Sequence, residues 1–140
     1  MIDESFCLEK VHDNATIAAI ATPLIPSAIG IIRVSGPQSV KVIEVIFKTN
    51  RVVDRRMVNG TAKDQNNNII DDCCYTFYKG PKSYTGEDVL EIFCHGSIYI
   101  VKELIKCITI IPDCRLAKNG EFTQRAFING KIPLSKAESI

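Results

Sequence analysis

The chain has 140 residues, of which 46% are hydrophobic and 24% are charged, and its formal net charge at pH 7 is +1. A chain of this length buries about two-thirds of its unfolded surface, so we expect a single domain with one core. The balance of 17 basic and 16 acidic residues, with no basic run longer than Arg55-Arg56, excludes a strongly basic surface for nucleic acid. Most of any contact with RNA would then come from another region.

The first half of the chain predicts two strands, one helix and a hairpin, in that order. The apolar segments Ala15–Ala21 and Ala28–Ser35 predict strands, and the prolines between them argue against a membrane span. Apolar residues then recur at helical spacing over about residues 38–48, and we expect this helix to cover the sheet with its apolar face. Two further strands, Met57–Lys63 and Ile69–Tyr78, flank a polar segment rich in Asn and form the predicted hairpin.

The second half predicts a strand, a helix, a short strand and a short helix. Asp88–His95 predicts a strand, in which alternate residues face opposite ways. A helix with an apolar stripe begins at Gly96-Ser97 and ends at Pro112. Arg115–Ala117 predicts one more short strand, and the helix that follows ends near Gly130. This mixture of segments predicts an α+β domain.

The last residues of the chain have the S-x-x-E spacing of a helix-capping box, formed by Ser135 and Glu138. Isolated helices of fewer than about a dozen residues are marginal, so we expect the natural protein to continue beyond this start. We therefore divide the chain into an N-terminal extension (1–13), a central domain (14–133) and the start of a truncated helical domain (134–140).

Six cysteines and two histidines bear on metal binding and redox chemistry. The cysteines form no C-x-x-C pair, so the sequence predicts neither a zinc site nor another metal site. Cys73 and Cys74 are adjacent in an apolar run, where successive strand residues face opposite ways, and we interpret them as small core residues. Reduced thiols and the absence of an apolar signal segment in the first 14 residues indicate a cytoplasmic protein.

The sequence contains no recognisable catalytic or nucleotide-binding motif. His12 and His95 lie outside any motif of the G-x-S-x-G type, and for His95 we favour a structural or supporting role. Gly130-Lys131 is not a phosphate-binding P-loop, because Arg125 occupies the position of its first glycine. We therefore expect no catalytic residue and no GTP site in this chain.

Two charged residues interrupt apolar strands. Glu91 lies within Val-Leu-Glu-Ile-Phe, so its face is either exposed to solvent or part of a pocket that offers N–H donors to the carboxylate. Arg33, within Ile-Ile-Arg-Val, raises the same question with the opposite charge. The residues alone leave both alternatives open.

Five motifs follow one another along the chain. They are TIAAIATP at 16–23, AIGIIRVSG at 28–36, SYTGEDVLE at 83–91, CHG at 94–96 and GEFTQRAFINGK at 120–131. In order and spacing they closely resemble the start of the tRNA-modification GTPase family MnmE, also called TrmE. The resemblance runs from about residue 14 to the last residue, and residues 134–138 resemble the start of the family's central helical domain.

This resemblance implies a folate-binding α+β domain, similar to folate-dependent aminomethyltransferases, with a mixed or antiparallel sheet and covering helices. It implies a homodimer that binds 5-formyltetrahydrofolate and supplies the one-carbon side of wobble-uridine modification in tRNA, of the 5-carboxymethylaminomethyl type. In full-length members a further domain hydrolyses GTP with magnesium and potassium, and a flavoprotein of the MnmG (GidA) type is the partner. The chain would then be a non-membrane, N-terminal part that lacks the GTPase domain and is not itself catalytic.

By the same resemblance, the family's folate contacts correspond to Arg33, Glu91 and Lys131. This assignment is chemically consistent, because a pterin edge offers adjacent N–H donors that one carboxylate can accept. The formyl and glutamate oxygens of a folate suit the donors of Arg and Lys. The resemblance thus favours a pocket over a solvent-exposed face for the two charged residues in the strands.

The chain departs from the family pattern in its loops. The usual P-P-G-R-G is Pro23-Leu24-Ile25-Pro26-Ser27, and the usual H-G-G is His95-Gly96-Ser97. These departures allow an alternative function, a dimerisation module whose folate pocket is degraded, although the three folate-contact residues argue against it. A third alternative, a stand-alone aminomethyltransferase, would need catalytic residues that the sequence does not offer.

Overall fold

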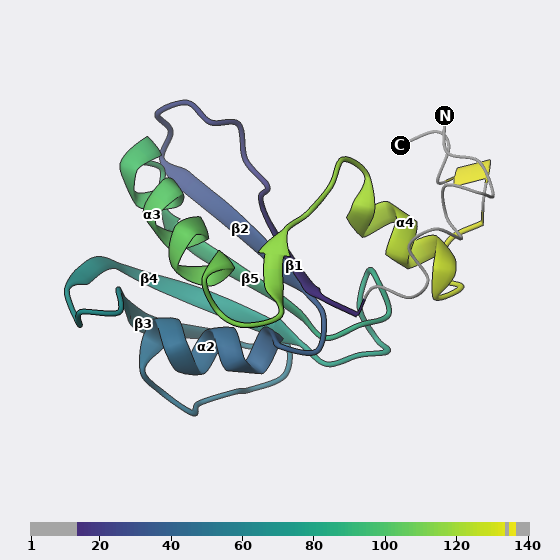
Figure 1. The fold of residues 1–140 in the computed structure, drawn as a ribbon, viewed down its shortest axis with the longest axis horizontal. Coiled ribbons are helices and arrows are strands. Elements are labelled where there is room, and N and C mark those ends of the chain that lie inside the picture. The colour runs from purple at the N-terminus through teal and green to yellow at the C-terminus, as the bar shows by residue number, and fades with distance from the viewer. Residues whose placement is uncertain (1–13, 134, 137–140) are drawn as a thin grey trace.

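A mixed six-stranded sheet forms the centre of the fold (Figure 1), and the computed structural model describes residues 14–133 and 135–136. The strand order is β3-β4-β5-β2-β1-β6. The strands are β1 (Thr16–Ile20), β2 (Ile29–Ser35), β3 (Met57–Lys63), β4 (Ile69–Tyr78), β5 (Val89–His95) and β6 (Cys114–Leu116). All neighbouring strands are antiparallel except β1 and β6, which are parallel. The sheet confirms the predicted α+β class.

Two of the three helices within residues 14–133 cover one face of this sheet. α2 (Ser39–Phe47) packs against β3 and β5, and α3 (Ile98–Thr109) packs across the strands from β4 to β6 (Figure 1). α4 (Glu121–Ile128) lies beyond the end of the sheet (Figure 1). Neither α2 nor α3 therefore covers the opposite face of the sheet.

The core lies between the sheet and the two covering helices. The two central strands contribute the fully buried side chains Ile32, Val34, Leu90 and Ile92. Burying such a side chain stabilises the fold by about 1.5–3 kcal/mol, and a slip of one residue would turn every side chain of a strand to the other face. The register of β5 is therefore strongly fixed, and Glu91 must face away from the core.

The helix start and the hairpin form as the sequence predicts. The Ser97 side chain accepts a hydrogen bond from the backbone N–H of Ile100 at 3.4 Å and caps α3. In the hairpin between β3 and β4, Oδ1 of Asp64 accepts hydrogen bonds at 2.9 Å from the backbone N–H groups of Asn66 and Asn68. Such side-chain contacts stabilise a turn locally, which is why short polar segments predict turns so well.

Two expectations at the C-terminal side differ from the structure. The short strand begins at Cys114 rather than Arg115, because Cys114 pairs with Thr16 at the start of β1. Ser135 and Lys136 have helical geometry, whereas the predicted cap keeps Ser135 outside the helix. Its proposed partner Glu138 lies outside the described residues, as does the expected N-terminal extension.

The cysteines within residues 14–133 are free thiols, and Cys7 lies outside the described part of the chain. Burial raises the pKa of Cys73 to about 12 and that of Cys94 to about 11, so both thiols stay protonated at neutral pH. A protonated thiol is a poor nucleophile. The interpretation as a packing residue is therefore supported for Cys73, which packs against the core, whereas Cys74 faces the opposite side of β4.

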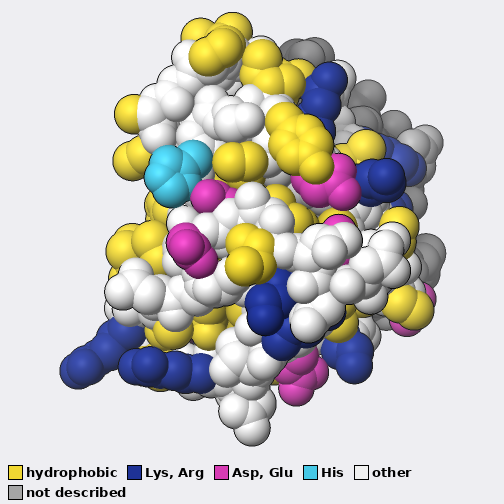
Figure 2. Space-filling view, turned by 90° about the vertical axis from the view of Figure 1, so that its left-hand side faces the viewer, with side chains coloured by type: hydrophobic (Ala, Val, Ile, Leu, Met, Phe, Trp, Pro, Cys, Tyr) yellow, Lys and Arg dark blue, Asp and Glu magenta, His cyan; other side chains and the backbone are white. Residues whose placement is uncertain are grey.

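The surface agrees with the balanced charge of the chain. On the face shown in Figure 2, Lys and Arg side chains are scattered among hydrophobic and acidic ones and form no continuous basic stripe. No helix in the described part of the chain is long and apolar enough to cross a membrane.

Candidate functional site

Arg33 and Glu91 are direct neighbours across β2 and β5, on the face that α2 and α3 leave uncovered. Nε and Nη2 of Arg33 both donate to Oε2 of Glu91, at 3.1 and 2.8 Å. The Glu91 side chain is only 18% exposed, and hydrogen bonds to Arg33 offset the cost of burying its polar oxygens. The structure thus brings together two of the three predicted folate contacts. The sequence left open whether each of these charged residues is exposed to solvent or has a partner, and in the structure each is the partner of the other.

A cavity of about 400 Å³ lies over this pair and is called the Arg33–Glu91 pocket below. Its floor is formed by side chains of β2 and β5, and one side is formed by the loop of residues 79–88 between β4 and β5, the pocket loop. The lining residues are Arg33, Tyr78, Ser83, Tyr84, Thr85, Val89 and Glu91. Its volume lies within the range of about 300–1,000 Å³ that is usual for small-molecule sites.

Tyr78 at the end of β4 supports the carboxylate from the other side. Its hydroxyl donates to Oε1 of Glu91 at 3.4 Å, whereas Arg33 holds Oε2. Burial, followed by the negative charge of Glu91, raises the pKa of Tyr78, so the hydroxyl remains a donor at neutral pH. Both oxygens of Glu91 are therefore oriented. Three of the roughly four acceptor positions of a carboxylate are used, which leaves one position on Oε1 for a donor of a ligand.

The pocket loop is fixed by hydrogen bonds at several points. The backbone N–H of Gly80 donates to Oδ1 of Asp88 at 2.9 Å. The hydroxyls of Thr85 and Ser35 lie 2.7 Å apart, which joins the loop to the end of β2. Nδ2 of Asn129 donates to the carbonyl of Thr85 at 2.7 Å, just beyond α4. These contacts make the loop a fixed side of the pocket.

A buried ion network joins the pocket loop to α4. Arg125 contacts Glu87 of the loop at 3.1 Å and Glu121 at 3.3 Å, and Arg115 contacts Glu121 at 2.6 Å. Burial alone would raise the pKa of Glu121, but hydrogen bonds from Arg115 and the backbone N–H of Lys118 and the two arginine charges lower it to about 2. Sequence reasoning missed this network, although the i, i+4 spacing of Glu121 and Arg125 is a detectable signal.

Lys131, the third predicted contact, does not line the Arg33–Glu91 pocket. Its Nζ is exposed and donates to the carbonyl of Pro81 in the pocket loop at 3.0 Å. The residue therefore lies on the outer side of the loop whose inner residues Ser83 to Thr85 line the pocket. An ammonium has three donors, so this contact leaves donors for another oxygen.

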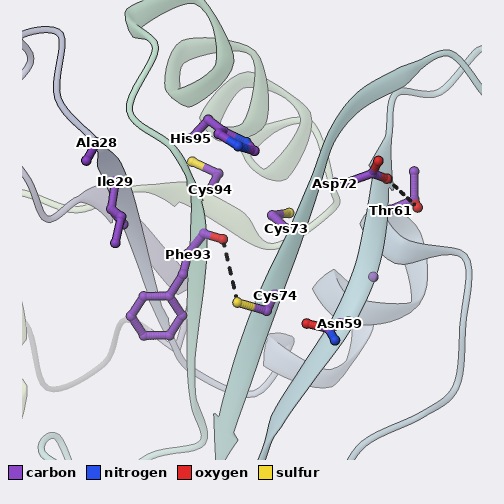
Figure 3. Close-up of a pocket in the computed structure, with 11 residues that line it drawn as sticks. Ala28, Ile29, Asn59, Thr61, Asp72, Cys73, Cys74, Phe93, Cys94 and His95 are labelled. Carbon is purple, nitrogen blue, oxygen red and sulfur yellow. Dashed lines mark hydrogen bonds between the residues drawn. The ribbon is translucent and has the colours of Figure 1, made fainter.

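A larger cavity of about 600 Å³ opens elsewhere, where β4 and β5 separate (Figure 3). The last pair between these strands is Cys74 and Phe93, beyond which β5 pairs only with β2. Asp71 spans the separation, because its carboxylate accepts from the backbone N–H of His95 at 2.9 Å and contacts Nδ1 of His95 at 2.8 Å. The contact with Asp71 agrees with the structural role that we favoured for His95. The cavity between the separating ends of β4 and β5 is called the fork cavity below.

The fork cavity offers less chemistry than the smaller pocket. Its lining residues Cys73 and Cys94 are protonated thiols, and Asp72 accepts a hydrogen bond from Thr61 at 2.8 Å (Figure 3). Within the described residues, no group of three or more His, Cys, Asp and Glu side chains is placed to hold a metal ion. The Arg33–Glu91 pocket, although smaller, is the better candidate site because both oxygens of its carboxylate are oriented, by an arginine and a tyrosine.

Comparison with known protein families gives a match over most of the chain. The family model described as "GTP-binding protein TrmE N-terminus" matches residues 16–131. The chain belongs to this family. The part that matches the TrmE N-terminus contains the whole sheet, the pocket loop, α4 and Lys131.

Several curated proteins are similar to this TrmE N-terminal domain. It is 45% identical over 130 residues to a tRNA modification GTPase MnmE from Fervidobacterium nodosum, and 48% identical over 131 residues to one from Clostridioides difficile. It is 43% identical over 126 residues to one from Thermotoga maritima. Each comparison covers 89% of this chain and 28% of the relative, so the chain spans less than a third of the length of these relatives.

Proposed function

We propose that this domain binds a reduced folate, 5-formyltetrahydrofolate, in the Arg33–Glu91 pocket. The observation that carries the proposal is the oriented carboxylate, with Arg33 on Oε2 and Tyr78 on Oε1 of Glu91. The edge of a pterin presents N–H donors, and one of them can take the acceptor position that Arg33 and Tyr78 leave open on Oε1 of Glu91. Glu91 would read this edge of the ring.

The charge of the pocket favours a neutral, donor-rich ring over a phosphate. Glu91 already neutralises Arg33, so the pocket holds no spare positive charge on its floor. The other end of a folate carries glutamate carboxylates, which suit a cation outside the pocket. Lys131 on the outer side of the pocket loop offers such a cation, so the three residues can serve the two ends of one ligand.

The alternative function, a dimerisation module with a degraded folate pocket, rests on the altered loops of this chain. Two of these loops meet each other, since the backbone N–H of Ser27 donates to the carbonyl of Gly96 at 3.0 Å. Ala28, next in the chain, and His95 line the fork cavity. None of the altered residues of these two loops lines the Arg33–Glu91 pocket, which supports a working pocket.

The proposal also concerns the role of this domain in a full-length tRNA modification GTPase. We propose that the domain serves tRNA modification in the cytoplasm, on the one-carbon side of wobble-uridine chemistry, as part of a homodimer. In that proposal GTP, magnesium and potassium belong to a GTPase domain, and a flavoprotein of the MnmG type and tRNA are the partners. The names of the similar proteins, tRNA modification GTPases, support this assignment, and the domain itself binds and positions without catalysing.

Calorimetric titration of the chain with 5-formyltetrahydrofolate tests the proposal. We expect saturable binding by the wild type and loss of binding in Glu91→Gln, because an amide nitrogen replaces one acceptor oxygen. Asp72→Asn makes the same chemical change in the fork cavity and serves as the matched control, with binding expected to persist. A folded Glu91→Gln variant that bound as tightly as the wild type would disprove the site and favour the dimerisation module.

A further inference from the structure

Tyr84 is held at its hydroxyl end while much of its side chain stays open. The residue is 48% exposed and lines the Arg33–Glu91 pocket from the pocket loop. Its hydroxyl lies 3.2 Å from Oγ1 of Thr123 in α4. Its neighbour Thr85 is tied to Ser35 at 2.7 Å. A large ring is therefore fixed beside the pocket without being buried by the fold.

The second aromatic ring in the pocket lining is engaged differently. Tyr78 donates its hydroxyl to Glu91, and the guanidinium of Arg55 lies over its ring, 5.8 Å from the centroid. Tyr78 thus belongs to the support of the carboxylate. Of the two rings in this lining, Tyr84 is the one whose surface is left for a ligand.

From this arrangement we infer that Tyr84 stacks on the flat ring of the ligand and so determines the affinity of the pocket for the ring end of a folate. The inference rests on the proposed folate function and adds a residue to it. Glu91 holds only the edge of the ring, whereas the two faces of a conjugated ring gain most from contact with another flat apolar surface. A reduced pterin keeps such a flat, conjugated half, so Tyr84 can pack against it while Glu91 accepts an N–H donor of its edge.

α4 sets the position of this ring through two contacts. The hydroxyl contact with Thr123 acts on Tyr84 directly. The ion pair between Arg125 and Glu87, at 3.1 Å, holds the loop against the same helix. Thr123 is only 7% exposed, which keeps the hydroxyl contact out of bulk water. Thr123 and Arg125 are therefore positioning residues that act through Tyr84 and do not touch the ligand.

Three variants separate the ring from its hydroxyl. Tyr84→Phe keeps the ring, Tyr84→Leu removes it at an exposed position, and Thr123→Val removes the hydroxyl partner. We expect Tyr84→Phe and Thr123→Val to bind 5-formyltetrahydrofolate within about threefold of the wild type, since one hydrogen bond contributes little and the Arg125–Glu87 ion pair still holds the pocket loop against α4. Tyr84→Leu should bind about tenfold more weakly, equivalent to about 1.4 kcal/mol and within the range measured for stacking of a base on an aromatic side chain.

Proton NMR of the ligand distinguishes stacking from a purely structural role of Tyr84, because a structural role would not change the chemical shifts of the ligand. Protons of the ligand ring should shift upfield on binding to the wild type and to Tyr84→Phe, because of the aromatic ring current. They should shift much less with Tyr84→Leu, in which only the Tyr78 ring remains in the pocket lining. The tail fragment p-aminobenzoylglutamate lacks the pterin and should bind the wild type and Tyr84→Leu equally. A melting curve of each variant verifies that it is folded.

The outcomes distinguish the inference from the function on which it rests. If the wild type binds no 5-formyltetrahydrofolate, the proposed function is wrong and the inference is wrong with it. If the wild type binds but shows no upfield shift, or if Tyr84→Leu binds as tightly as the wild type, folate binding stands and stacking is overturned. Equal losses in Tyr84→Phe and Tyr84→Leu would assign the effect to the hydroxyl and likewise overturn stacking.

Discussion

Replacing Glu121 with glutamine should destabilise the domain at neutral pH and much less in acid. The Glu121 side chain is 1% exposed and lies 2.6 Å from Arg115 and 3.3 Å from Arg125. Burial by itself opposes ionisation, but the hydrogen bonds and charges around the carboxyl lower its pKa from the ordinary value of 4.5 to about 2. Because the folded pKa is the lower one, the ion network stabilises the fold above pH 4.5, and this stabilisation is lost as the pH falls toward 2.

The magnitude follows from the same two pKa values. One pKa unit corresponds to about 1.36 kcal/mol, so the charged carboxylate contributes roughly 2–3 kcal/mol at pH 7 after allowance for the partly exposed Arg115. Glu121→Gln should lower the free energy of unfolding by this amount at pH 7. At pH 3 the difference between the variant and the wild type should fall to about 1 kcal/mol.

Urea unfolding monitored by circular dichroism at pH 7, 5, 4 and 3 measures this difference. Glu44→Gln, a matched change at an exposed position of α2, should alter the free energy of unfolding by less than about 0.5 kcal/mol at every pH. A Glu121→Gln variant as stable as the wild type at pH 7 would refute the reasoning. So would a loss of stability that is the same at pH 3 as at pH 7.

Three further predictions concern ligand binding, packing and assembly. Glu91→Ala should weaken binding of 5-formyltetrahydrofolate by about 2–4 kcal/mol, because a ligand donor loses its acceptor and Arg33 loses its ion-pair partner. Lys131→Ala should weaken it by only about 1–2 kcal/mol, because its ammonium acts as a point charge. Arg33→Ala should fall between them, and calorimetry that ranks Lys131 first would contradict the site. Gly96→Ala should destabilise the fold by about 1–3 kcal/mol in urea unfolding, because an added Cβ would lie 2.0 Å from the carbonyl oxygen of Ser27. Sedimentation at tens of micromolar, a concentration on the order of usual dimer affinities, should show a homodimer, and a monomer throughout would count against the proposed assembly.

The elements of the fold could be predicted because their signals are local. In β5, a short run of apolar residues that is interrupted by Glu91 predicts a strand, and the buried Leu90 and Ile92 lie on the face toward the core. The cap of α3 by Ser97 and the turn around Asp64 each depend on contacts within a few residues. Such signals are fully present in the sequence before any tertiary contact forms.

The site could be predicted only in part, since its contacts are distant in sequence. Periodicity shows that Glu91 and Arg33 share the property of a charge in an apolar strand, but not that β2 and β5 are neighbours. The family resemblance selected the two residues, and the structure supplied their contact. Tyr78 and Tyr84 were missed, because an aromatic residue in a strand or loop is indistinguishable from an ordinary packing residue until its exposure is known.

The position of Lys131 is a second example of what the sequence could not predict. Resemblance groups it with Arg33 and Glu91, although its Nζ contacts the outer side of the pocket loop. A motif records which residues serve one ligand and carries no information about which end of the ligand each residue meets. For a long ligand with two chemically different ends, those are separate questions.

The pairing of β2 with β5 has a consequence for how the domain folds. Arg33 and Glu91 are 58 residues apart in the chain, so their contact forms only after a long loop has closed, whereas the β3–β4 hairpin needs a much shorter closure. The pocket should therefore assemble late in folding, after the hairpin that lies inside the loop. A ligand that recognises the closed pair binds the folded chain alone and stabilises it by mass action, by about 2.7 kcal/mol at a hundred times its Kd. Supply of the ligand would then control the lifetime of the folded domain as well as the occupancy of its pocket.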